Sequence, residues 1–103
     1  MSVAREIDTS AVDDKALELR RDGASFKTIA KKLNLARSAD ANAAFQRSLR
    51  RRPAAERKRL RRDELERLDK LAARVRASQE HSPDQVARRL AVVARMRAKL
   101  LAD

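Results

Sequence analysis

Apolar side chains recur three and four residues apart over most of the chain, a spacing that places them on one face of an α-helix. The clearest such face consists of Phe26, Ile29, Ala30 and Leu33. Ser25, directly before it, is a suitable N-terminal cap, and Asn34, directly after it, belongs to the residue type that most readily replaces glycine in a left-handed turn. Because the whole chain has only one glycine and two prolines, this pattern predicts an all-α protein made of a few helices.

A first helix is predicted before this segment, over residues 11–22. Its start is marked by Ser10 as a cap and by Asp13 and Asp14, whose charges suit the positive end of a helix dipole. Residues 1–9 show no periodic pattern, and we predict that they form a flexible N-terminal tail.

A third helix is predicted to begin near Ser38 or Asp40 and to end at about residue 51. Residues 10–52 would then form a helix–turn–helix DNA-binding domain of three helices, whose last helix can lie in the major groove. On that helix we place one set of polar side chains outward, namely Asn42, Gln46 and Arg50, with Arg47 and Arg51 beside them.

The C-terminal half, residues 53–103, is predicted to be an antiparallel hairpin of two long helices. Pro53 suits the first turn of one helix, and Ser82 followed by a proline is a strong start for the next. The apolar seam of these helices consists of Leu65, Leu68, Ala72, Val75, Val86, Leu90, Val93 and Leu100. This seam is either the inside of a monomeric hairpin or, as we favour, an oligomerisation surface, because so thin a hairpin buries little area alone.

The chain carries a formal net charge of +11, which predicts affinity for polyanions. Nucleic acid is the first candidate, and an anionic membrane surface is the second. Residues 37–62 contain ten Lys and Arg but two Asp and Glu, so +8 of the charge falls in this segment. No apolar run is long enough to span a bilayer and no signal-peptide pattern is present, so we expect a cytoplasmic or nucleoid location without membrane insertion.

The charge and the helix pattern together predict contacts with double-stranded DNA. Asn and Gln can read adenine edges, and Arg can read guanine or bind phosphate. The predicted DNA-binding residues are Arg37, Ser38, Asn42, Gln46, Arg47, Arg50, Arg51, Arg52, Arg57, Lys58 and Arg61. The alternatives are a solvated polar face on the third helix, and a basic helix after it that binds RNA or an acidic protein.

Catalysis and cofactor binding are not expected. The chain has no cysteine, and its single histidine, His81, lies in a predicted loop without metal-ligand spacing. Neither a glycine-rich phosphate loop nor a nucleophile–base pair occurs. We therefore predict a protein that is not an enzyme and that uses no cofactor.

Three segments in succession resemble a known family: KALELRRDGASFKTIAKKLNLARSADANAAFQRSLRR, RRDELERLDKLAARVRA and DQVARRLAVVARMRAKLLAD. Over about residues 15–101 the chain is similar to small helix–turn–helix proteins of actinobacterial phages and prophages, of the terminase small-subunit kind. The resemblance implies a subunit that recognises viral DNA for packaging, assembles through its C-terminal helices, and acts with a terminase large subunit. Other interpretations are a dimeric transcriptional or excision regulator with the same fold, and a basic adaptor for RNA or an acidic protein.

Overall fold

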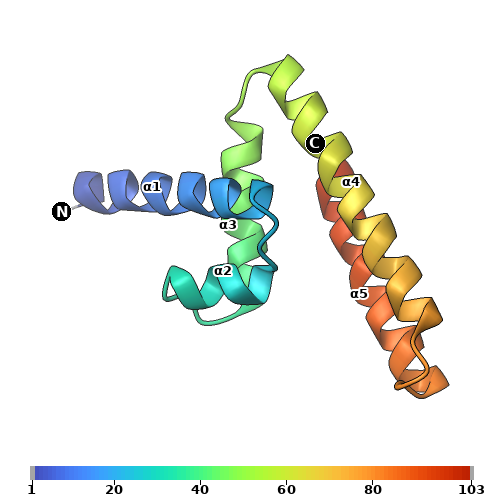
Figure 1. Ribbon diagram of the computed structural model, residues 1–103. Coiled ribbons are helices and arrows are strands. Elements are labelled where there is room, and N and C mark those ends of the chain that lie inside the picture. The colour runs from blue at the N-terminus through green and yellow to red at the C-terminus, as the bar shows by residue number, and fades with distance from the viewer. Residues whose placement is uncertain (1, 103) are drawn as a thin grey trace. The chain divides into compact units, whose positions relative to one another are not determined.

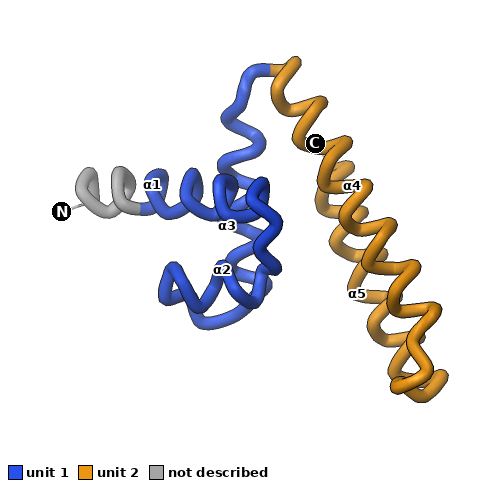
Figure 2. The backbone as a smooth tube through the Cα atoms, viewed as in Figure 1, with its two compact units in different colours: residues 1–53 blue, residues 54–103 orange. Residues whose placement is uncertain are grey.

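The computed structural model of the chain describes the backbone of residues 2–102 and the side chains of residues 9–102. In that part of the chain all regular secondary structure is α-helical, which confirms the predicted all-α class (Figure 1). The chain divides into two compact units, residues 1–53 and residues 54–103 (Figure 2). Each unit has its own helix packing and is described by itself.

The first helix, α1 (Ser2–Arg21), begins earlier than the sequence pattern indicated. We predicted a tail over residues 1–9 and a cap at Ser10, and the predicted helix start is wrong because residues from Ser2 onward already belong to α1. This segment contains no glycine or proline, so nothing in it ends a helix that propagates from the first turns. Asp13 and Asp14 consequently lie well inside α1 and not at its positive end.

The second helix, α2 (Phe26–Lys32), has the predicted cap: the Ser25 hydroxyl accepts a hydrogen bond from the Thr28 amide at 3.1 Å. After Leu33 the chain turns at Asn34, whose φ of 58° lies in the left-handed region, as predicted for this residue. The Leu35 amide then donates to the Ala30 carbonyl at 2.8 Å, which closes the helix end.

The third helix, α3 (Ser38–Arg50), is capped by Arg37 and not by Ser38 or Asp40. Asp40 lies in the first turn, and its carboxylate accepts a hydrogen bond from the Arg37 amide at 3.2 Å. This contact satisfies the Arg37 amide, while the Arg37 side chain, which has no acceptor, cannot bind the free amides of the first turn.

Both α1 and α2 pack against α3, and the core of the first unit lies where they meet. Leu17, Ile29 and Phe45 are almost completely buried there. The rings of Phe26 and Phe45 lie 5.7 Å apart, and the Arg20 guanidinium covers Phe26 at 4.0 Å from its centroid. This arrangement buries the apolar stripe of α2 that dominates the sequence pattern.

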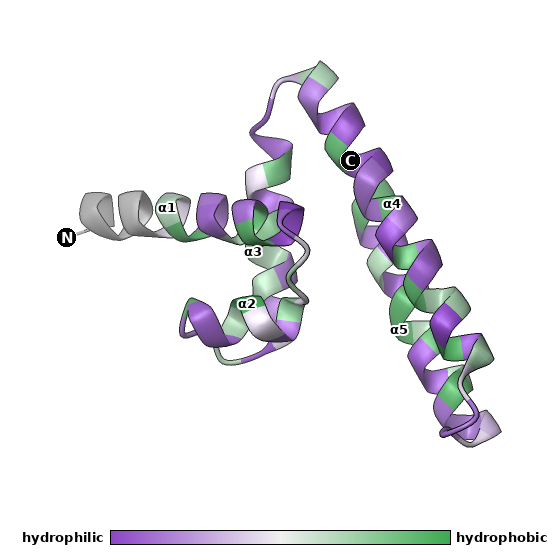
Figure 3. Ribbon diagram, viewed as in Figure 1, coloured by the Kyte–Doolittle hydropathy of each residue, from purple (hydrophilic) through white to green (hydrophobic). Residues whose placement is uncertain are grey.

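The second unit consists of α4 (Ala54–Ala77) and α5 (Pro83–Leu101), which pack against each other and are joined by residues 78–82. The predicted start of α5 is confirmed: the Ser82 hydroxyl accepts from the Gln85 amide at 3.2 Å, and Pro83 occupies the first turn. Apolar positions along both helices follow the contact between them (Figure 3).

Most of the predicted oligomerisation seam is buried within the single chain. Five of its eight residues are buried: Leu68, Ala72, Val75, Val93 and Leu100. The other three are only half-buried: Leu65, Val86 and Leu90. The prediction placed Leu65 at the start of the α4 seam, whereas Leu60 and Glu64 are the buried residues there. Glu64 can occupy this inward position because Arg67 binds its carboxylate at 3.3 Å.

Candidate nucleic-acid interface

The exposed face of α3 is made of small side chains and arginines. Ala39, Ala43, Arg47 and Arg50 are exposed, and their spacing of four, four and three places them on one side of the helix. Because Ala39 and Ala43 are small, the α3 backbone can approach a docked surface closely. This face, which we call the α3 face, differs from the one that the sequence pattern indicated.

Asn42 and Gln46, the predicted readers of adenine, point inward, so their predicted outward placement is wrong. They are only 7% and 6% exposed, and the Gln46 Nε2 donates to the Asn42 Oδ1 at 3.3 Å. The spacing of the apolar residues alone indicates a single buried stripe on α3. Two helices pack on α3, however, and the buried arc is wide enough to include a polar pair that satisfies itself.

Asp13 of α1 binds two of the predicted DNA-binding arginines. Its carboxylate is 1% exposed and accepts two hydrogen bonds from Arg47, at 3.1 Å and 3.0 Å, and one from Arg51 at 3.2 Å. The two arginine side chains remain 47% and 44% exposed. Each therefore has N–H groups directed away from the acid, since a guanidinium carries five donors.

Asp14, the next residue of α1, extends this network to the end of α3. It accepts a hydrogen bond from the Ser48 hydroxyl at 2.7 Å and pairs with Arg51 at 3.3 Å and with Arg52 at 3.5 Å. The Ser48 hydrogen bond, assisted by Arg51 and Arg52, lowers the pKa of Asp14 below its ordinary value. No local sequence pattern indicates this network, because the partners lie 34 to 38 residues apart.

The remaining predicted residues of the first unit differ in their pairing. Ser38 is exposed at the start of α3, and Arg37 next to it is exposed and pairs with Asp40 at 3.6 Å. Arg50 is exposed, and among residues 9–102 no carboxylate pairs with it. Arg50 is therefore the arginine of α3 whose charge is most completely available to a phosphate.

The basic segment of α4 also contains both half-buried cations and exposed ones. Arg61 is half-buried, and its Nε donates to the Leu100 carbonyl of α5 at 3.1 Å, which gives it a role in holding the two helices together. Arg57 is also half-buried. Lys58 and Arg59 are exposed, and within the described part of the chain neither has an ion-pair partner.

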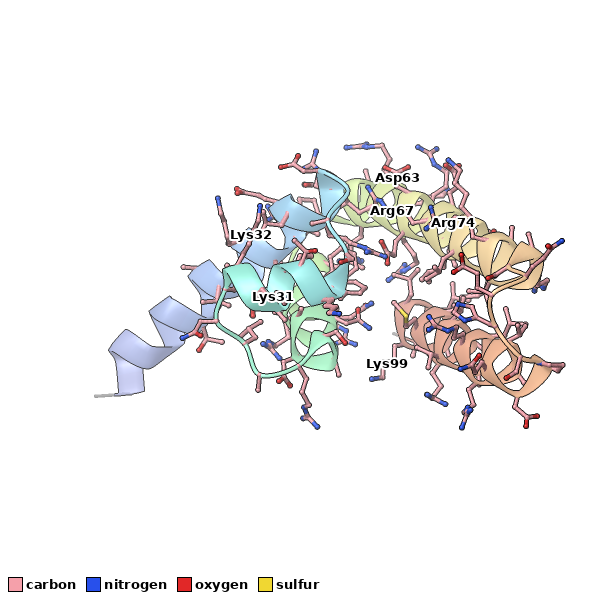
Figure 4. All side chains as sticks on the ribbon, turned by 60° about the horizontal axis from the view of Figure 1, so that its bottom comes forward. Lys31, Lys32, Asp63, Arg67, Arg74 and Lys99 are labelled. Carbon is pink, nitrogen blue, oxygen red and sulfur yellow. The ribbon has the colours of Figure 1, made fainter. Side chains whose placement is uncertain are left out.

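Three lysines on α2 are candidate phosphate contacts that the sequence argument missed. Lys27, Lys31 and Lys32 are exposed, and no acid among the described side chains pairs with them. Lys31 and Lys32 are labelled on α2 in Figure 4. Their spacing of four and one residues, on a helix with no acidic residue, was the signal available in the sequence.

The described residues contain neither a metal-binding cluster nor a membrane-spanning helix. No three His, Cys, Asp or Glu side chains there are grouped so that they can hold a metal ion. None of the helices examined there combines the length and the hydropathy that crossing a membrane requires. Scans of protein-family models, curated proteins and solved structures gave no match to this chain.

Proposed function

We propose that the chain binds double-stranded DNA through its first unit, which acts as a helix–turn–helix. The single observation that carries this proposal is the α3 face, where small residues and arginines share one exposed side of a helix packed on α1 and α2. In this proposal α3 enters the major groove, with Arg50 and the outward N–H groups of Arg47 toward the DNA.

The turn between α2 and α3 supports the helix–turn–helix assignment. Ala30 is 5% exposed, and Asn34 adopts the left-handed conformation that reverses the chain four residues later. A small residue at position 30 lets two helices approach closely. A left-handed residue at position 34 lets the chain turn sharply. The exposed lysines of α2 would bind the phosphates flanking the groove, which positions the unit without reading sequence.

The resemblance to terminase small subunits supports a narrower role. In that role the second unit, as an antiparallel helical hairpin, assembles copies of the chain, and the assembly presents viral DNA to a large subunit. Because Leu68, Val93 and Leu100 are already buried within one chain, assembly would use the half-buried Leu65, Val86 and Leu90. A mass of many copies in light scattering favours the packaging role, whereas a stable dimer on a palindromic site favours a regulator.

The test of DNA binding compares two exposed alanines. Ala43→Gln places a bulky side chain on the α3 face, while Ala73→Gln makes the same change on the exposed side of α4. Neither position is buried, so both variants should keep the helix content of the parent chain. We expect Ala43→Gln to weaken duplex binding by at least about tenfold, or 1.4 kcal/mol, and Ala73→Gln to leave it unchanged.

A salt titration then tests the phosphate contacts. Replacing Arg50 by Ala should reduce the slope of log K against log salt by about 0.9, the value for one phosphate contact. If the parent chain has no affinity for duplex DNA at low salt, the proposed function is wrong. Equal losses in the two glutamine variants would instead show that α3 does not enter a groove.

A further inference from the structure

The outer face of α5 carries positive charge without interspersed acids. Arg88, Arg89, Arg95 and Lys99 are exposed on this helix, and Asp84 in its first turn is the one acid within it. Arg88, Arg95 and Lys99 share one side of the helix, directed away from the buried Val93 and Leu100, and Arg89 lies about 100° to one side of them. We call these four cations the α5 stripe. The neighbouring helix α4 differs, because it contains five acids as well as cations: Glu56, Asp63, Glu64, Glu66 and Asp69.

The members of the α5 stripe have no ion-pair partner among the described side chains. Arg97, the remaining arginine of α5, differs from them because Asp69 of α4 binds it. Arg88 and Arg89 also border a shallow hollow of about 260 Å³, which Gln85 and Val92 complete. From Arg88 to Lys99 the stripe extends over about 16 Å at 1.5 Å per residue.

We propose that the α5 stripe is a second DNA-binding surface, so that one chain can hold two duplex segments together. This inference rests on the proposed function of the first unit, which would hold the first duplex. Duplex DNA carries about one charge per 1.7 Å of its axis when both strands are counted, so a stretch of duplex as long as the stripe carries more phosphates in all than the stripe has cations. The number of phosphates therefore does not limit the number of contacts that the stripe can make.

The packing of α5 favours DNA over a membrane surface as the partner. A helix that binds a membrane interface inserts an apolar face among the lipids. The apolar residues Val93 and Leu100 of α5 are instead buried. Beside the stripe, only Val92 and Leu101 are large exposed apolar side chains within the described residues. Between Arg88 and Lys99 the exposed side chains of α5 are thus the four cations, three small alanines and Val92, so the charged groups there outnumber the large apolar ones.

The experiment measures bridging by the full chain. One duplex is fixed to beads, a second, fluorescent duplex is free, and the recovered fluorescence reports chains that hold both. We expect the triple variant Arg88→Gln, Arg89→Gln and Arg95→Gln to lose at least about tenfold in bridging. It should retain binding of a single duplex, and the salt slope of bridging should fall by about 2.7, for three phosphate contacts at 0.9 each.

Two control variants distinguish an effect of the α5 stripe from an effect of the net charge of the chain. The variant Lys70→Gln, Arg74→Gln and Arg76→Gln removes the same charge from exposed positions of α4 and should bridge normally. Lysine at the three α5 positions should also preserve bridging, because it keeps each charge.

Three results would overturn the inference. The first is bridging that survives the α5 glutamine variant, as it would if an oligomer bridged through the first unit alone. The second is an equal loss in the α4 control. The third is stripe-dependent binding to anionic phosphatidylserine vesicles without stripe-dependent bridging. Failure of the parent chain to bind a single duplex would refute the proposed function as well, whereas normal single-duplex binding with stripe-independent bridging would refute only this inference.

Discussion

Replacing Asp13 by Asn exchanges only one non-hydrogen atom, but it should destabilise the first unit strongly. The substitution removes the negative charge from a carboxylate that is 1% exposed and that accepts three hydrogen bonds from Arg47 and Arg51. Charge-assisted hydrogen bonds contribute about 1.5–3 kcal/mol each, and losing one partner of a buried ion pair costs about 3–5 kcal/mol. Since both arginines are nearly half exposed and can return to water, we expect a loss of about 2 kcal/mol.

The chain offers a probe that reports on the first unit alone. It has no Trp or Tyr, and its two phenylalanines, Phe26 and Phe45, both lie in that unit. Ring-proton NMR signals or the near-ultraviolet circular dichroism of phenylalanine, followed during heating, therefore measure its unfolding. A loss of 2 kcal/mol corresponds to a decrease in Tm of roughly 18 °C for a unit of 53 residues.

The matched control is Glu18→Gln, which removes the same charge from the same helix. Glu18 pairs with Lys15 at 3.6 Å, with both side chains more than half exposed, so its loss should cost less than about 0.5 kcal/mol. A double variant of Asp13→Asn with Arg47→Gln should lose less than the sum of the single losses. Equal decreases for Asp13→Asn and Glu18→Gln, or strict additivity in the double variant, would refute the account of the network.

Three further predictions concern other parts of the fold. The stabilisation by Asp14 should be present above its ordinary pKa of about 3.9 and should disappear as the pH falls through its lowered folded pKa. The difference in Tm between the parent chain and Asp14→Asn should therefore be seen at pH 6 and vanish in strong acid. Gln46→Ala should cost about 2 kcal/mol in the phenylalanine-monitored melt, through a lost buried hydrogen bond, without changing preference among DNA sequences; a changed preference would mean that it faces DNA. Leu68→Ala should cost about 3 kcal/mol in the second unit and Leu65→Ala clearly less, measured by helical circular dichroism; the reverse order would contradict the burial of Leu68 and the partial exposure of Leu65.

The helices themselves were largely predictable from the sequence because their signals are local. The caps at Ser25 and Ser82 and the left-handed turn at Asn34 are determined by residues a few positions apart, and all three were correctly predicted. The start of α1 was not, because a good capping residue such as Ser10 can also lie inside a helix when the preceding residues do not end it.

The orientation of side chains on α3 was less predictable for a geometric reason. Periodicity indicates that one face is buried, but it does not reveal that two helices will cover the same third helix. Asn42 and Gln46 lie within the wide arc of α3 that is buried. Likewise, no local pattern links Asp13 to Arg47. Arg47 and Arg50 therefore look equivalent in the sequence, although among the described residues an acid binds only Arg47 of the two.

The ion pairs between α1 and α3 have a consequence for the order of folding during synthesis. Asp13 finds its partners only after residues 47 and 51 have been made, so α1 and α2 must leave the ribosome before the first unit can close. The second unit can form by zipping outward from residues 78–82, where α4 and α5 are already neighbours. The N-terminal unit thus begins first on the ribosome but depends on a distant contact, while the C-terminal unit begins last and can close locally.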